Sequence, residues 1–177
     1  MTLRFLFLLA ACLAAFGCAS QEQRTAESSR PRVIYIKDFN TSEWPWEVGL
    51  SGQKLAEYKK VHQKALSHYL TDTLGKSVST AQYPGLRPKE GWVVTGVFTS
   101  VRSGNRALRA VSMGNAGESS VRTLVRVYNL NVLADEPLFS FDTHQSSQNA
   151  AVTLNSDIKH TSQEIASKLK NYLEKVK

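Results

Sequence analysis

The stretch WVVTGVFTSV, residues 92–101, decides the fold together with the stretch SVRTLVRVYNL, residues 120–130. The second stretch alternates between two sets of side chains, which are Val121, Thr123, Val125 and Val127, and Arg122, Leu124, Arg126 and Tyr128. A period of two predicts a strand with one buried face. In the first stretch, Gly96 marks a bulge or a point where another group packs closely against the backbone. We therefore expect two strands with a long connection between them.

That connection, GNRALRAVSMGNAGESS at residues 104–120, is rich in glycine and contains the pattern Gly114-x-x-Gly117. A nucleotide-type phosphate loop leads from a strand into a helix, whose first amide groups meet the phosphate. This stretch leads from one strand to another, so its glycines are better explained as turn and bulge positions. Connections of this length are often functional or disordered. The loop is therefore our first candidate for a binding surface.

Three shorter runs predict the remaining strands. Residues 33–39 form an apolar run with β-branched members, as in a strand buried on both faces inside a sheet. A short strand follows at residues 78–83. Residues 138–144 form another strand, with Phe139 and Phe141 on one face.

Two amphipathic helices complete the pattern. Apolar side chains recur every three or four positions between residues 54 and 74 and again at residues 156–176. The expected fold is of the α+β (or α/β) class, a two-layer sandwich of one mixed sheet of about four to five strands with two helices on one face. Because a helix follows the first strand, that strand should be central and parallel to at least one neighbour.

The N-terminus has the layout of a secretory signal. Arg4 precedes an apolar run at residues 5–16, which is shorter than the roughly 20 residues that a bilayer requires. The run ends in Ala-Phe-Gly-Cys at residues 15–18, which resembles the bacterial lipobox, where the cysteine receives a diacylglycerol and the chain is cut before it. Cys12 follows a closer lipobox match but leaves a shorter apolar core, so we expect Cys18 to be acylated. An ordinary cleaved signal is the other alternative.

The expected division of the chain is a lipoprotein signal peptide (1–17), a flexible tether (18–31) and a single α+β domain (32–177). The residue after Cys18 is not aspartate, which by resemblance to enterobacterial lipoproteins implies sorting to the outer membrane, facing the periplasm. Once Cys12 leaves with the signal and Cys18 is acylated, no thiol remains for a disulfide, for catalysis or for metal binding.

The chain is basic. Its formal net charge is +7, and removal of the signal, which contains Arg4 and no acidic residue, lowers that charge by one. Such a charge either serves solubility or attracts anionic partners, such as lipopolysaccharide or phospholipid headgroups. Nucleic acid is the usual partner of a basic chain, but a periplasmic location argues against it.

The two central strands and their connection resemble a bacterial family. The matching pattern is a strand and turn at residues 93–109, the glycine loop at 114–117, and an alternating strand at 121–128 that ends in Val-Tyr. It is similar to the pattern of the domain-of-unknown-function family DUF4410, whose members are mostly small secreted or lipid-anchored proteins, and it covers roughly residues 32–175. The family implies no known activity. In topology alone, the order of elements is similar to periplasmic domains of the curli-secretion lipoprotein and of lipoproteins that activate penicillin-binding proteins, which favours a protein-binding module.

Two sets of residues are candidates for binding. Five arginines are expected to gather at one end or along one face of the hairpin, and these are Arg102, Arg106, Arg109, Arg122 and Arg126. Guanidinium groups suit bidentate binding of phosphate or carboxylate. The alternative is that one or two of them form structural ion pairs and the others are solvated. Trp44 and Trp46 flank Pro45 and either cap the core or offer an aromatic anchor to a partner.

Few residues suggest catalysis or metal binding. Asp142 and His144 share a strand face, and a carboxylate beside a histidine makes a general base, but no serine or cysteine motif accompanies them. His62 and His68 point roughly 120° apart on the predicted helix and cannot share a metal. No metal-ligand spacing is present in the sequence. We therefore expect neither a metal nor a small-molecule cofactor.

The expected function is a non-enzymatic binding or adaptor module that is anchored in the outer membrane and binds another envelope component, in the first place a protein. One alternative is a basic module that binds anionic lipid or glycan. The other is a small periplasmic hydrolase that uses Asp142 and His144.

Overall fold

The computed structural model describes residues 30–105, 117–132, 136–147 and 153–176. The elements in chain order are β1 (Ile34–Ile36), β2 (Trp46–Glu47), α2 (Gly52–Gly75), β3 (Thr80–Gln82), β4 (Trp92–Arg102), β5 (Ser119–Asn129), β6 (Phe139–Ser147) and α4 (Leu154–Lys175). The predicted signal peptide, the tether up to residue 29 and Cys18 lie outside the described residues. Arg106 and Arg109 of the predicted arginine cluster also lie outside them.

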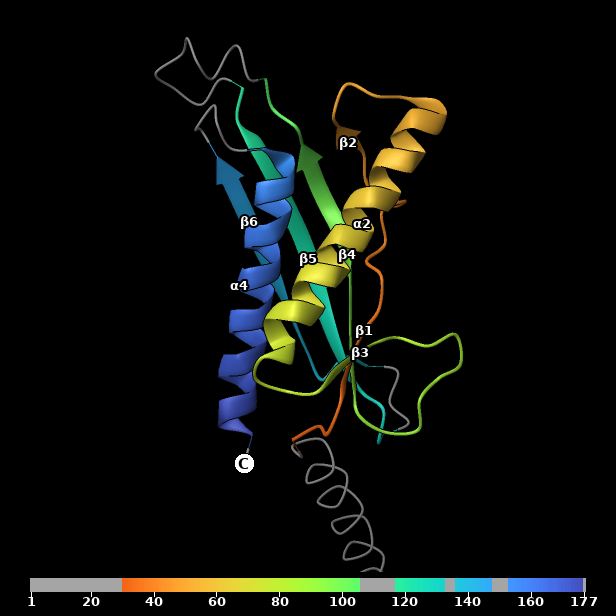
Figure 1. Cartoon of the computed structure of the whole chain (residues 1–177), viewed down its shortest axis with the longest axis vertical. Helices are drawn as coiled ribbons and strands as arrows, with labels where there is room; N and C mark the ends of the chain where they lie inside the picture. The colour runs from red at the N-terminus through yellow and green to blue at the C-terminus, as the bar shows by residue number, and fades with distance from the viewer. Residues whose placement is uncertain (1–29, 106–116, 133–135, 148–152, 177) are drawn as a thin grey trace, which may run out of the picture.

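The strands form one mixed sheet in the order β3-β1-β4-β5-β6, and β2 also pairs with β4 (Figure 1). β1 is parallel to both of its neighbours, β3 and β4, whereas β4, β5 and β6 form an antiparallel meander. The predicted interior position and parallel pairing of the first strand are therefore confirmed. The sheet has six strands, slightly more than expected, because the segment after Pro45 adds the two-residue strand β2.

β4 is paired along much of its other edge by a chain segment that runs parallel to it. β1 pairs with the beginning of β4, Asn40 forms an isolated bridge with Val97, and β2 pairs with the end of β4. The turn around Pro45 lies between the last two contacts. This arrangement places Glu47 opposite Arg102 in the register.

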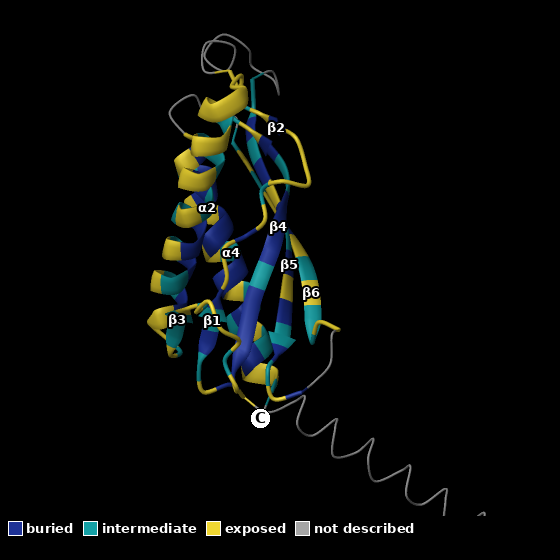
Figure 2. Cartoon of the chain, turned by 90° about the vertical axis from the view of Figure 1, so that its right-hand side faces the viewer, coloured by how far each residue is buried: buried dark blue, intermediate teal, exposed yellow. Residues whose placement is uncertain are grey.

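Both helices pack on the same face of the sheet (Figures 1 and 2). Val121, Val125 and Val127 of β5 are buried in one core cluster with apolar side chains of both helices. Burial of these alternate valines stabilises the fold by about 1.5–3 kcal/mol for each fully buried side chain. The predicted two-layer sandwich is thus confirmed. Neither helix in the described part of the chain combines the length and the apolar character that a membrane crossing requires.

Gly96 is a point of close packing and not a bulge. A Cβ atom built on Gly96 would lie 2.5 Å from the Leu124 carbonyl oxygen and 2.6 Å from Cε1 of Phe39. The irregularity in the β4–β5 register falls later, between Phe98 and Ser100. Of the two roles that the sequence suggested for this glycine, the structure therefore assigns close approach.

Candidate functional site

No described element covers the sheet face opposite the helices, which we call the open face (Figure 2). By strand pairing, the open face includes Val93, Thr95, Val97, Ser100 and Arg102 of β4, Ser120, Arg122, Leu124, Arg126 and Tyr128 of β5, and Ser140, Asp142, His144 and Ser146 of β6. The open face holds the second set of β5 side chains that the alternation predicted. It also receives most of the described candidate site residues.

Three of the five candidate arginines lie on the open face, and they differ in their partners. Arg102 forms an ion pair with Glu47, with 2.8 Å between Nε and Oε2 and a second hydrogen bond of 3.4 Å. Both side chains are more than half exposed, so solvent screens the pair and its contribution to stability is small. Among the described residues, Arg122 and Arg126 form no ion pair, and both are exposed.

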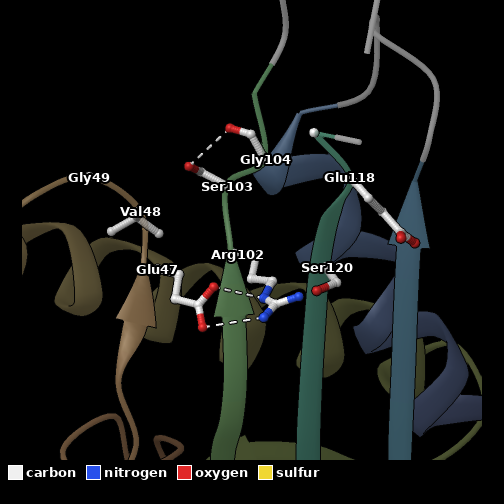
Figure 3. A pocket seen from close by; sticks show the side chains of 9 residues that line it. Glu47, Val48, Gly49, Arg102, Ser103, Gly104, Glu118 and Ser120 are labelled. Atoms are coloured by element: carbon white, nitrogen blue, oxygen red, sulfur yellow. Dashed lines mark hydrogen bonds and ion pairs between the residues drawn. The ribbon is translucent and has the colours of Figure 1, made fainter. Parts of the chain in front are cut away.

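The hollow at the loop end of β4 and β5, which we call the upper hollow, has a volume of about 590 Å³ (Figure 3). Its lining consists of Glu47, Val48, Gly49, Arg102, Ser103, Gly104, Gly117, Glu118 and Ser120. The Arg102 guanidinium points between Glu47 and Ser120, while Glu118 points away toward β6. Two carboxylates and one guanidinium give the described lining a formal charge of −1. The upper hollow by itself is therefore a poor site for an anion.

The predicted long loop leaves the sheet from the rim of the upper hollow. The backbone N–H of Asn105 donates to the Gly117 carbonyl over 2.9 Å and closes the base of the loop. Gly104 and Gly117 have φ values of +67° and +82°, a region that glycine enters at little cost. These two glycines are thus turn positions, as expected, and Gly114 lies outside the described residues.

Arg122 lines a neighbouring hollow of about 290 Å³ together with Arg102, Glu118 and His144. Arg122 lies directly opposite His144 on β6 and opposite Ser100 on β4. This part of the open face therefore mixes both signs of charge.

The two candidate tryptophans occupy different environments. Trp46 is 6% exposed and packs against Phe98, with ring centroids 5.2 Å apart. It also meets Tyr58 edge to face. Trp46 therefore caps the core, and the prediction of an anchor at this position is wrong because its indole has no free face. Trp44 is 48% exposed and remains the candidate anchor.

Asp142 and His144 are exposed on β6, and no hydrogen bond joins their side chains among the described residues. Their neighbours on β5 are Leu124 and Arg122.

The Nδ1 atom of His62 lies 2.9 Å from the Tyr58 carbonyl oxygen. Within the described ranges, no three histidine, cysteine or carboxylate side chains lie close enough together to hold a metal ion.

A hollow on the open face that the sequence did not reveal lies at the other end of β4, and we call it the lower hollow. Its volume is about 300 Å³, and its lining consists of Lys37, Tyr83, Arg87, Val93, Thr95, Tyr128 and Leu130. Of these residues, the alternation in the sequence predicted only the outward position of Tyr128. The two cations of the lower hollow come from different segments, Lys37 just after β1 and Arg87 in the connection between β3 and β4, and the pairing of β1 with β4 brings Lys37 to the hollow.

The fold resembles solved structures of low sequence identity, and no curated protein matches the chain. A PelC dodecamer from Paraburkholderia phytofirmans aligns with a TM-score of 0.53 at 12% identity, over 80% of this chain and 89% of that chain. The hypothetical protein CT253 from Chlamydia trachomatis aligns with a TM-score of 0.53 at 10% identity, over 81% and 98%. Such likeness concerns the fold alone.

The match to a family model is more specific than these structural likenesses. The model of the domain of unknown function DUF4410 matches residues 34–167, which include every strand, α2 and the first part of α4. The central strands and loop that suggested this family lie inside the matched range. The chain therefore belongs to the DUF4410 family.

Proposed function

We propose that this protein is a non-enzymatic binding module of the bacterial envelope, anchored through Cys18 in the outer membrane and facing the periplasm. Its open face binds another envelope component, and the leading candidate for this partner is a protein. The observation that carries the proposal is that Arg122 and Arg126 stand exposed on the open face without an ion pair among the described residues.

Exposure of a sheet face is not by itself an argument, because antiparallel sheets often leave one face to water. The argument rests on charge and spacing. Arg122 and Arg126 lie four residues apart on the same face of β5, with Leu124 between them. Guanidinium groups bind carboxylates in a bidentate manner, and this pair suits an acidic protein surface. The alternative, a module that binds anionic lipid or glycan, relies on the cations of the same face.

The proposal that the protein is not an enzyme is supported by the surroundings of Asp142 and His144. Both are exposed on an edge strand, and neither lines a hollow with a hydrogen-bonded nucleophile among the described residues. A general base needs a positioned proton donor within hydrogen-bond reach. The hydrolase alternative therefore has less support than binding.

Site-specific photo-crosslinking in intact cells tests the proposal. A photoreactive amino acid at Ser140, exposed on the open face, should give a discrete protein adduct, whereas one at Lys64, exposed on α2, should not. The double substitution Arg122→Gln and Arg126→Gln should reduce the Ser140 adduct. Equal adducts at both positions, or an adduct indifferent to the two arginines, would contradict the proposal. A lipid adduct from Ser140 would favour the alternative partner.

A further inference from the structure

The lower hollow combines an apolar floor with aromatic walls. Val93 is 6% exposed and forms the floor, and Tyr128 stands directly beside it on β5. The other wall is Tyr83, whose backbone N–H donates to the Ile36 carbonyl over 2.9 Å and so ties the residue to β1. Tyr35 packs edge to face against Tyr83, with ring centroids 6.5 Å apart. Two rings are thus held by the sheet on either side of the floor.

The charged groups of the lower hollow all have one sign. Lys37 and Arg87 are exposed members of its lining, which contains no carboxylate among the described residues. The Lys37 Nζ atom lies 5.5 Å from the centroid of the Tyr83 ring, within the range of a cation–π contact. Arg126 is the cross-strand neighbour of Thr95 and adds a third cation at the border. The upper hollow, with two carboxylates and one guanidinium, has the opposite balance.

We propose that the lower hollow binds an acidic sugar, a pyranose that carries a carboxylate or a phosphate. The apolar C–H face of the ring packs on Val93 and the tyrosine rings, whose hydroxyl groups offer polar handles. The anionic group receives charge-assisted hydrogen bonds from Lys37 and Arg87. A volume of about 300 Å³ stands at the lower end of small-molecule sites and suits one unit of a glycan.

Other small ligands match the lower hollow less well. Inorganic phosphate engages the cations and leaves the rings unused, and a neutral sugar engages the rings and leaves the cations without a counter-ion. The inference goes beyond the proposed function, because it names a small acidic ligand for one end of the open face. It involves binding alone, so no bond is formed or broken.

Amide NMR titration of the lipidated chain in detergent micelles tests the inference. Glucuronate should shift the signals of Val93, Thr95 and Tyr128 with saturation. Glucose and inorganic phosphate should each bind at least about tenfold more weakly than glucuronate, because each of them makes only one of the two sets of contacts. Absence of a saturable shift, shifts mapping elsewhere, or equal binding of phosphate would each overturn the inference.

Charge substitutions at the two ends of the open face distinguish specific binding in the lower hollow from a general attraction of anions to this face. Arg87 lies in an exposed connection, so Arg87→Gln should leave the fold intact. The substitution should weaken the binding of glucuronate about tenfold. Arg122→Gln, at the other end of the same face, should leave glucuronate binding unchanged. Equal weakening by both variants would overturn the inference. Loss of sugar binding with the Ser140 crosslink retained would reject this inference alone, and the reverse result would reject the proposed function alone.

Discussion

At the scale of single residues, Gly96 sets how closely β4, β5 and the segment after β1 approach one another. The carbonyl of Leu124 and the ring of Phe39 occupy the space where a side chain would begin. We expect Gly96→Ala to lower the free energy of unfolding by about 1–3 kcal/mol, because a backbone oxygen cannot move aside freely. Urea denaturation measures the loss.

Gly85→Ala is the matched control for Gly96→Ala. Nothing lies within 4 Å of a Cβ atom at Gly85, and its φ is not positive. This substitution should leave stability within about 0.5 kcal/mol of wild type or raise it slightly. Similar losses in both variants would show that close approach at Gly96 is not the cause.

The burial of Tyr58 predicts that the protein loses stability at alkaline pH. Burial raises the pKa of the Tyr58 phenol above its ordinary value of 10.0. Because the pKa is higher in the folded state than in the unfolded state, the neutral phenol contributes its full stabilisation below pH 10.0. This contribution is lost as the pH rises from 10.0 through the folded-state pKa. Tyr58→Phe keeps the ring that packs against Trp46 and removes the ionisable group.

The measurement is urea unfolding of both proteins over the alkaline range. The stability of the wild type should fall more steeply than that of Tyr58→Phe. The same decline in both would assign the loss to other groups.

At the scale of elements, the two helices begin differently. The Thr153 side chain accepts a hydrogen bond from the Ser156 backbone N–H over 3.4 Å and caps α4. Ser51 stands at the same position before α2 and makes no such bond. We expect Thr153→Ala to cost about 1 kcal/mol. Ser51→Ala should cost less than about 0.5 kcal/mol. Thermal and urea unfolding compare them, and equal losses would contradict the assignment of the cap.

At the scale of the whole molecule, the proposed anchor predicts where lipid is attached. Cells fed a clickable fatty acid should label the wild type, and the label should be lost on Cys18→Ser because the acceptor thiol is gone. Cys12→Ser should keep the label, since that residue leaves with the signal. Loss on Cys12→Ser with retention on Cys18→Ser would move the anchor to the earlier cysteine.

The fold was largely predictable because its determinants are local. Alternation in residues 120–130 reports which side of a strand is buried, and spacings of three and four in residues 54–74 report a helix stripe. β2 escaped prediction because two residues after a proline carry no period. The roles of Trp44 and Trp46 stayed open for a related reason, since neighbouring positions in an irregular segment do not reveal which one meets the core.

The sequence by itself determined the class of fold, the order of its elements, the outward placement of Arg122 and Arg126, and the membership of DUF4410 that the family match confirms. Only the tertiary structure decided that Glu47 neutralises Arg102 across 55 positions of the chain, and that Lys37, Tyr83 and Arg87 meet Tyr128 on one face. Periodicity is a property of neighbouring residues. Ion pairs and hollows depend on the register between distant segments, which the packing of the whole sheet sets.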